Sequence, residues 1–169
     1  MDVIDIVKEQ IEASHRKVVG LAKGVDFNNW YTIPEGVGTN VAWQLGHLII
    51  SKPFQLVIAP IERTKEIYDI IPFRDYLKLY GIGTSPKPKV EGSPEPDVLL
   101  SDFDKIHQYS LKRLNGFDQS TLEEPTVVPH PIAKTKYECL MWSFQHEIWH
   151  CGQLSMLRRA LGIPINIKL

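Results

Sequence analysis

The chain has 169 residues, a formal net charge of -1 and 43% hydrophobic residues, values typical of one globular domain, expected over 1–169. This charge gives no positive field that would attract nucleic acid or anionic lipid. No segment approaches about 18 uninterrupted apolar residues, and the N-terminal MDVIDIVKEQ lacks the regions of a signal peptide. Two cysteines are too few for a disulfide scaffold, so the chain is predicted to be cytoplasmic. The charge and the lack of a long apolar segment predict that it binds neither nucleic acid nor a membrane.

The first predicted helix covers residues 2–23, because apolar side chains recur there at steps of three and four residues. His15 lies on this apolar stripe, one turn after Ile11. We expect it to be a hydrogen-bonded histidine at the edge of the core, and the alternative is a place in the wall of a site.

Residues 28–40 are rich in proline and glycine and are predicted to form a loop. The next helix, NVAWQLGHLIISKPF, is capped by Thr39 or Asn40 and is apolar on most faces, which predicts a place in the middle of a bundle. His47 lies on an apolar line of this helix and should point into protein. Pro53 should kink or loosen the helix about a turn later.

The stretch from residue 74 to residue 96 is dense in proline, glycine and serine, and is predicted to be a long crossover loop between the second and third helices. The third helix is predicted over residues 97–115, with His107 at the edge of its stripe and therefore at the surface. Residues 126–134 form an extended connection interrupted by prolines, in which His130 should be exposed.

The last predicted helix begins at a capping box formed by Thr135 and Glu138, and it ends at Leu161 before Gly162 and Pro164. The sequence has no alternating strand pattern and no internal repeat. Four helices and one long crossover predict an all-α four-helix bundle.

Two histidines one turn apart lie in the last helix, in the segment HEIWHCGQL. His146 and His150 are about 40° apart around the helix axis, on the buried side that also carries Leu154. Two imidazoles at this spacing can share one metal ion, which removes the cost of burying both without a partner.

The same segment fits the H-E-x-x-H pattern of zinc proteases, but a protease of this kind needs a third ligand downstream. The sequence after His150 contains no His, Asp or Glu. A third ligand therefore has to come from upstream, and His47 is the best candidate because it alone is internal on a central helix.

Three segments together resemble the DinB/YfiT-like family of metal-binding four-helix bundles, and the likeness spans nearly the whole chain. They are NNWYTIPEGVG, NVAWQLGHLI and HEIWHCGQLSMLRRALGIP. The resemblance implies an up-down-down-up bundle in which His47, His146 and His150 hold the metal between the second and last helices. It also implies a small-molecule substrate, with either transfer of a low-molecular-weight thiol to an electrophile or metal-dependent hydrolysis.

Three neutral imidazoles leave a divalent ion its full charge and open positions, which is the arrangement of a catalytic site. They suit Zn, Ni, Fe, Mn or Co without choosing among them. The alternatives are a protein that captures a metal or small ligand without turnover, for example in a stress response, and a purely structural scaffold. Bundles of this kind often pair, so a homodimer is a further expectation.

Several polar side chains near the histidines have candidate supporting roles. Glu147 is the candidate catalytic group, because it lies about 60° around the helix from His150 and can contact a bound water or a ligand imidazole; the alternative is an ordinary carboxylate on the flank of the helix. Gln44, Ser143 and Gln153 each lie three residues from a proposed ligand and can orient an imidazole through its second nitrogen.

The tryptophans and cysteines near the histidines are not expected to take part. Trp43, Trp142 and Trp149 are interpreted as packing residues rather than a substrate cage. Cys139 lies about 10 Å along the helix from the histidine pair and Cys151 points away from it, so neither is expected to bind the metal.

Overall fold

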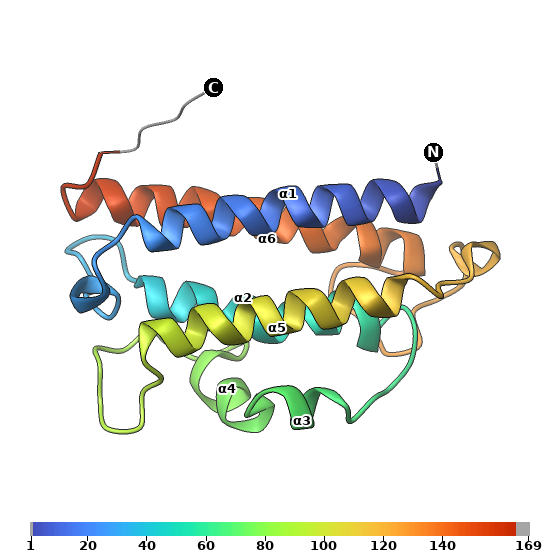
Figure 1. Ribbon diagram of the computed structural model, residues 1–169, viewed down its shortest axis with the longest axis horizontal. Coiled ribbons are helices and arrows are strands. Elements are labelled where there is room, and N and C mark those ends of the chain that lie inside the picture. Colours follow the sequence, from blue (N-terminus) through green and yellow to red (C-terminus); the bar gives the residue numbers. More distant parts are fainter. Residues whose placement is uncertain (1, 165–169) are drawn as a thin grey trace.

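Four long helices form a bundle within residues 2–164, which are the residues that the computed structural model describes (Figure 1). They are α1 (Val3–Lys23), α2 (Val41–Pro53), α5 (Pro96–Leu114) and α6 (Lys136–Ala160). No β-strand occurs in this range, so the expected all-α class is confirmed. The ends of the expected domain, residue 1 and residues 165–169, lie outside the described residues.

The bundle has up-down-down-up topology. In Figure 1, α1 and α6 run in one direction, and α2 and α5 run in the opposite direction. The most extensive packing is between α1 and α6 and between α2 and α5. Short single turns, η1 (Phe27–Asn29) and η3 (Gln119–Thr121), lie in the loops.

Helix starts follow the capping signals of the sequence. The Asn40 side chain accepts a hydrogen bond from the Trp43 backbone N–H at 2.8 Å, which satisfies one free amide at the start of α2. Thr135 and Glu138 form the expected capping box at the start of α6. These caps fix where α2 and α6 begin, and thereby the height at which each presents its histidines.

Pro53 ends the regular hydrogen-bonding of α2, and a π-helical turn, η2 (Phe54–Ile58), follows it directly. Proline has no backbone N–H to donate within a helix, so a local change of winding is expected there. The wider turn continues the helix path, and it carries Gln55 along the same side of the bundle as the histidines.

The crossover between α2 and α5 contains the loop expected over residues 74–96 only over residues 81–95, because the start of that range is helical. It contains two helices, α3 (Ile67–Ile70) and α4 (Phe73–Tyr80), and α4 packs against α2. The buried face of α4 is aromatic and only about two turns long. The proline-rich stretch after it obscured this helical periodicity in the sequence. Its buried residues are Phe73, Tyr76 and Tyr80.

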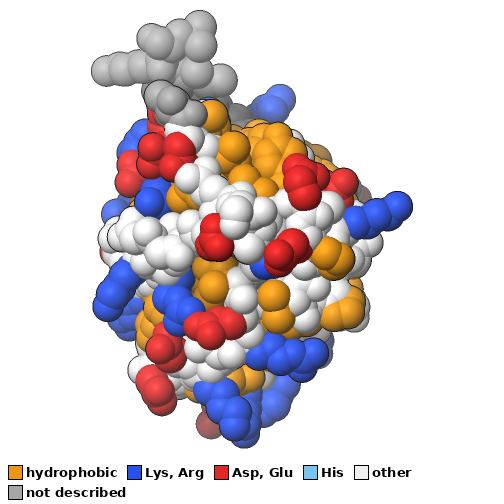
Figure 2. Space-filling model, turned by 90° about the vertical axis from the view of Figure 1, so that its right-hand side faces the viewer, with side chains coloured by type: hydrophobic (Ala, Val, Ile, Leu, Met, Phe, Trp, Pro, Cys, Tyr) orange, Lys and Arg blue, Asp and Glu red, His pale blue; other side chains and the backbone are white. Residues whose placement is uncertain are grey.

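The described surface shows no concentration of one charge on the face in Figure 2, where acidic, basic and apolar side chains are intermingled. No helix in residues 2–164 is both long enough and apolar enough to cross a membrane.

Candidate metal centre

The three histidines singled out by the sequence lie together between α2 and α6. Each offers one ring nitrogen, and these nitrogens lie within 4.8 Å of one another. The Nε2 atoms of His146 and His150 are 3.1 Å apart. A tetrahedral ion with Zn–N bonds of about 2.05 Å separates its ligand atoms by about 3.3 Å. The α6 pair therefore already has coordination spacing, and His47 needs to approach by no more than about 1.5 Å.

His47 is held by α4 and by its own helix. Its Nδ1 donates a hydrogen bond to the backbone carbonyl oxygen of Tyr80 at 2.9 Å. Its ring stacks on Trp43, with centroids 5.1 Å apart and planes 5° from parallel. A proton on Nδ1 leaves the lone pair on Nε2, which is the nitrogen available to a metal.

His150 is oriented by a chain of amides. The Gln44 amide nitrogen donates to Thr39 Oγ1 at 2.9 Å and to Gln153 Oε1 at 2.7 Å. Both N–H groups of Gln44 are thus used, so its Oε1 faces His150 and accepts a hydrogen bond from Nδ1. His150 Nε2 is therefore left with its lone pair. Gln44 contacts the imidazole as expected, whereas Gln153 acts through Gln44.

His146 contacts Gln55, a residue that the sequence analysis did not select. The Gln55 amide nitrogen lies 3.2 Å from His146 Nδ1, and in this orientation His146 Nε2–H donates to His150 Nε2. Turning the amide by 180° exchanges its oxygen and nitrogen. Nδ1–H then donates to the Gln55 oxygen, and Nε2 of His146 becomes free for a metal.

Ser143 does not contact an imidazole; its hydroxyl donates to the Leu140 carbonyl oxygen at 2.6 Å. The positions that sequence reasoning missed are Gln55 and the Tyr80 carbonyl. The only signal for Gln55 was the proline two residues before it, which changes the helix winding. A backbone carbonyl carries no side-chain signal at all.

Burial keeps all three histidines neutral. Burial, together with the neighbouring histidines, lowers the pKa of His146 to about 4 and the pKa of His150 to about 2. The pKa of His47 is also lowered by burial, although its hydrogen bond to Tyr80 opposes the shift. Neutral imidazoles are the form that binds a metal, so no proton has to be displaced at pH 7.

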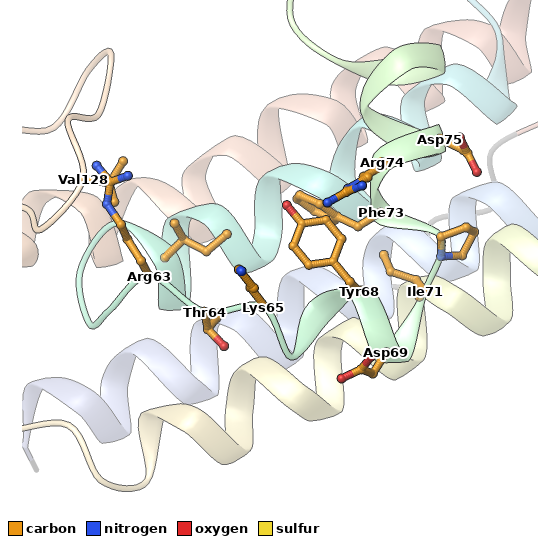
Figure 3. Close-up of a pocket in the computed structure, with 12 residues that line it drawn as sticks. Arg63, Thr64, Lys65, Tyr68, Asp69, Ile71, Phe73, Arg74, Asp75 and Val128 are labelled. Carbon is orange, nitrogen blue, oxygen red and sulfur yellow. The ribbon is translucent and has the colours of Figure 1, made fainter.

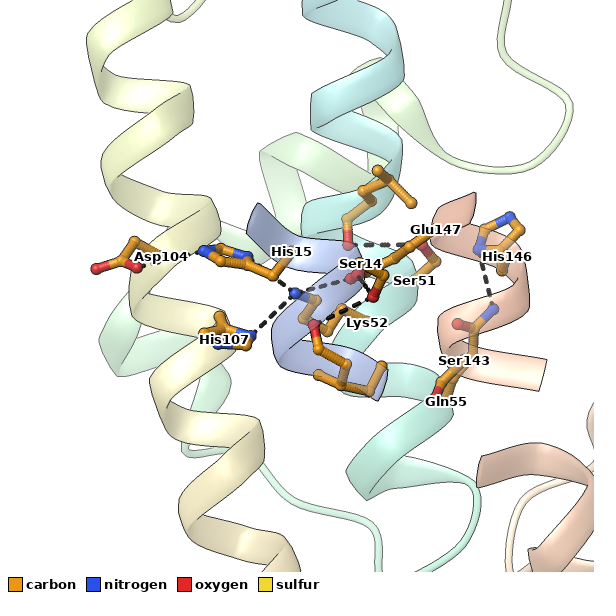
Figure 4. A network of polar contacts seen from close by, with 12 residues as sticks. Ser14, His15, Ser51, Lys52, Gln55, Asp104, His107, Ser143, His146 and Glu147 are labelled. Atoms are coloured by element: carbon orange, nitrogen blue, oxygen red, sulfur yellow. Dashed lines mark hydrogen bonds and ion pairs between the residues drawn. The ribbon is translucent and has the colours of Figure 1, made fainter. Parts of the chain in front are cut away.

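Glu147 does not face the histidines. Its carboxylate forms an ion pair with the Lys52 ammonium at 2.7 Å and accepts a hydrogen bond from the Ser14 hydroxyl. In Figure 4, Glu147 points toward Ser14 and Lys52, whereas His146 points to the other side, toward Gln55. The carboxylate is buried beside Lys52 and Ser14, so the candidate catalytic role for Glu147 has no support in these contacts.

Lys52 is the centre of a buried polar network that was not expected. Its three N–H donors reach Glu147 Oε1 at 2.7 Å and the Nδ1 atoms of His15 and His107, each at 3.2 Å (Figure 4). His15 is the buried, hydrogen-bonded histidine that was expected. His107 was expected at the surface; instead it is 4% exposed, and its ring stacks on His15 with centroids 3.8 Å apart.

A cavity of about 550 Å³ opens beside the metal-ligand group, with His47 and His146 in its wall. Trp142 and Trp149 also line it, so two of the tryptophans interpreted as packing residues face this space. His130, which was expected to be exposed, is half-buried in the same wall and stacks on the ring of Phe54.

The two cysteines are free and buried, and neither belongs to the group of candidate ligands. Burial raises the pKa of Cys139 and of Cys151 to about 12. A thiol with such a pKa carries almost no thiolate at pH 7, so neither side chain is a ready nucleophile.

The fold and the histidine group define a helical bundle with a candidate metal centre. The chain belongs to the DinB superfamily, whose family model matches residues 10–154, a range that includes all three histidines. A crystal structure described as the conserved protein of locus from Enterococcus faecalis superposes with a TM-score of 0.67 and 16% identity. The match covers 96% of this chain and 99% of that one. At this identity the likeness shows the fold alone. No curated protein matches the chain.

Proposed function

We propose that the protein binds one divalent metal ion through His47, His146 and His150 and uses it in a reaction on a small molecule. The observation that carries this proposal is that three separate groups hold the Nδ1 sides of the rings. These groups are the Tyr80 carbonyl, Gln55 and Gln44. A partner that accepts from Nδ1–H, as the Tyr80 carbonyl and Gln44 do and as Gln55 does once its amide is turned, fixes the ring orientation and raises the basicity of Nε2. Zn, Ni, Fe, Mn and Co all suit such a ligand set.

An ion with three protein ligands keeps at least one position for water or substrate. The wall that contains His47 and His146 is also the wall of the cavity, which gives a substrate access to that position. A divalent ion held there supplies Lewis-acid activation, which lowers the pKa of a water or thiol that it binds. The residues of this chain bind and orient the reactants, and the apolar walls exclude water.

The composition of the cavity favours thiol transfer over hydrolysis. A hydrolase built on H-E-x-x-H uses its glutamate as the general base, but Glu147 is paired with Lys52. None of the described residues that line the cavity is Asp or Glu. The protein's own thiols have high pKa values, so the thiol would come from a substrate. Its sulfur forms a bond to the electrophile, whose leaving group departs with the electron pair, and the thiol proton passes to solvent.

A second candidate function is capture of a metal or small ligand without turnover. The absence of a carboxylate among the residues lining the cavity favours this reading as well, because a binding protein needs no proton acceptor there. The homodimer and the cytoplasmic location expected from the sequence stay predictions.

Elemental analysis of the protein supplied with divalent metals tests the metal centre. We expect about one ion per chain in the native protein, and strong loss of metal in His47→Ala and His150→Ala. His130→Ala is the matched control, because this histidine lies in the cavity wall but outside the ligand group. A native protein that takes up no divalent metal, or a His130→Ala variant that loses it equally, would refute the site.

Turnover separates the enzyme from the binding protein. The metal-loaded protein is assayed with a panel of thiols plus a neutral electrophile, and with a panel of esters and amides. Metal-dependent loss of free thiol with formation of a thioether supports the transferase. Turnover of the esters or amides alone supports the hydrolase, and turnover of neither panel supports capture.

A further inference from the structure

Exposed apolar side chains gather around the mouth of the cavity beside the histidines. Leu77, Ile82, Ile132 and Trp149 are 43%, 87%, 58% and 61% exposed, and all four line this one cavity. They come from different segments: α4, the turn after it, the loop before α6, and α6 itself. Large apolar side chains left in water around a concavity mark a binding site.

The cavity wall is also free of charged side chains. None of the described residues that line it is Lys, Arg, Asp or Glu. A neighbouring cavity of about 800 Å³ shares the walls Ile58 and Phe73 with it. That second cavity carries Arg63, Lys65 and Arg74 together with Asp69 and Asp75 (Figure 3). Charged side chains therefore line the second cavity, whereas the described lining of the histidine cavity has none.

The polar groups that do face the histidine cavity are neutral. The Ser51 hydroxyl already donates to the His47 carbonyl oxygen at 2.8 Å, which leaves it as an acceptor. His130 Nδ1 accepts hydrogen bonds from the backbone N–H groups of Ile132 and Ala133, at 3.2 and 2.9 Å. Its proton is therefore on Nε2, which can donate to a ligand. None of these side chains carries a charge that would compensate an ionised group of a ligand.

We propose that this cavity binds an uncharged, largely apolar small molecule, with its polar or reactive end directed at His47 and His146. A charged ligand group would be desolvated against the apolar wall without a partner, whereas an aromatic or aliphatic body replaces water there favourably. The direction of the reactive end rests on the proposed metal site; the preference for an uncharged apolar body does not.

The shape of the site favours a small molecule over a second copy of the chain or a lipid surface. A volume of about 550 Å³ falls within the range of small-ligand pockets. The apolar rim encircles a concavity with histidines in its wall, whereas a docking face for a protein or membrane is commonly flat or convex.

The proposal is tested with two fluorescent probes that share one aromatic skeleton. N-phenyl-1-naphthylamine is neutral, and 8-anilinonaphthalene-1-sulfonate adds one anionic group to it. Both are titrated into chelator-treated protein whose fold is checked by near-UV circular dichroism. We expect the neutral probe to bind at least about tenfold more tightly, because the sulfonate finds no partner in the wall. Equal affinities, or tighter binding of the sulfonate, overturn the proposal.

Adjacent exposed residues of α6 provide the matched variants. Trp149 lines the cavity, whereas Ile148 is exposed but lies outside its lining. Trp149→Ala should weaken binding of the neutral probe about tenfold or more, and Ile148→Ala should leave it unchanged. Ile82→Lys adds a cation at the rim, so it should reduce the ratio of the affinity for the neutral probe to the affinity for the sulfonate. Equal effects of the two alanine variants contradict the assigned site.

Failure of this inference is distinguishable from failure of the proposed function. Neutral-probe selectivity in a protein that binds no metal keeps the apolar site and removes the metal centre. Metal binding without selectivity for the neutral probe keeps the metal centre and removes the apolar site. If the affinity for the neutral probe falls as the protein concentration rises and copies associate, the face is an interface between chains and the proposal is wrong.

Discussion

The backbone carbonyl oxygen of Tyr80 lies 2.9 Å from Nδ1 of His47, so the last residue of α4 orients a candidate metal ligand on α2. This contact requires α4 to lie close against α2. Gly46 permits the approach, because a Cβ added at that position would overlap the ring of Tyr80. A glycine one residue before His47 thereby controls how the imidazole is held.

Gly46→Ala is therefore expected to weaken metal binding. The added methyl group displaces the Tyr80 ring, and with it the carbonyl that fixes the His47 tautomer. Loss of such a partner typically lowers metal affinity about 10- to 100-fold. The measurement is a competition titration against a chromophoric chelator.

Gly152→Ala is the control for a glycine in a helix. Nothing lies within 4 Å of a Cβ added at Gly152. Alanine there should keep the metal affinity and raise the free energy of unfolding by about 0.5–1 kcal/mol, since alanine favours the helix. If Gly46→Ala keeps native affinity, the Tyr80 contact does not orient the ligand.

Gln55 is expected to determine which ring nitrogen of His146 carries the proton. Gln55→Leu removes the partner of Nδ1 and should lower metal affinity about 10- to 100-fold. Gln55→Glu can only accept at that position, so it favours the tautomer with Nδ1–H and a free Nε2. Its affinity should equal or exceed that of the native protein. Equal losses in both variants would show that the contact fills space rather than orienting the ring.

The sequence patterns were sufficient for the four-helix bundle and for the histidine pair on α6, whereas the up-down-down-up topology was implied by the resemblance to a family. Apolar periodicity and caps are local signals, and both survive in the folded chain at α1, α2 and α6. The spacing of His146 and His150 follows from helix geometry alone. Joining His47 to them needed the burial pattern of α2 and the resemblance to a family.

What the sequence did not reveal depends on contacts between distant segments. Glu147 was a candidate for the metal centre because it lies about 60° around the helix from His150, but Lys52 and Ser14 contact it on another side of α6. His107 lies at the edge of a periodic stripe, where exposure depends on the neighbouring helix. Stacking on His15 buries it. Neither partner is visible in a local pattern.

The ion pair between Lys52 and Glu147 is expected to be structural. Both side chains are buried, and removing one partner of a buried pair typically costs about 3–5 kcal/mol, because the other is left uncompensated. Glu147→Leu should therefore lower the free energy of unfolding by about that amount. Adding Lys52→Met to Glu147→Leu should recover most of the loss.

Urea unfolding of the two single variants and the double variant measures the coupling between these residues. Metal content measured in the folded double variant tests the role of Glu147 separately. We expect it to stay at about one ion per chain, as for a residue outside the site. A double variant that folds stably but no longer binds metal would return Glu147 to the metal centre.

The buried histidines should make the metal-free protein unstable in acid. Burial, together with the charges of Lys52 and Arg16, lowers the pKa of His107 to about 3. In the same way, burial and Lys52 lower the pKa of His15 to about 2. An unfolded histidine has a pKa of about 6.5, so between about pH 6 and pH 4 the unfolded chain binds protons that the folded chain does not.

Stability therefore falls as the pH drops below about 6.5, by about 1.4 kcal/mol per pH unit for each such histidine. His107→Gln can still accept from Lys52 but cannot titrate. The free energy of unfolding of chelator-treated protein is measured in urea at a series of pH values. Its slope against pH should be smaller in this variant by the contribution of one histidine, about 1.4 kcal/mol per pH unit. Identical slopes would mean that His107 takes up a proton in the folded state, and that the Lys52 network opens in mild acid. The variant separates this network from the metal ligands because His107 lies outside the ligand group.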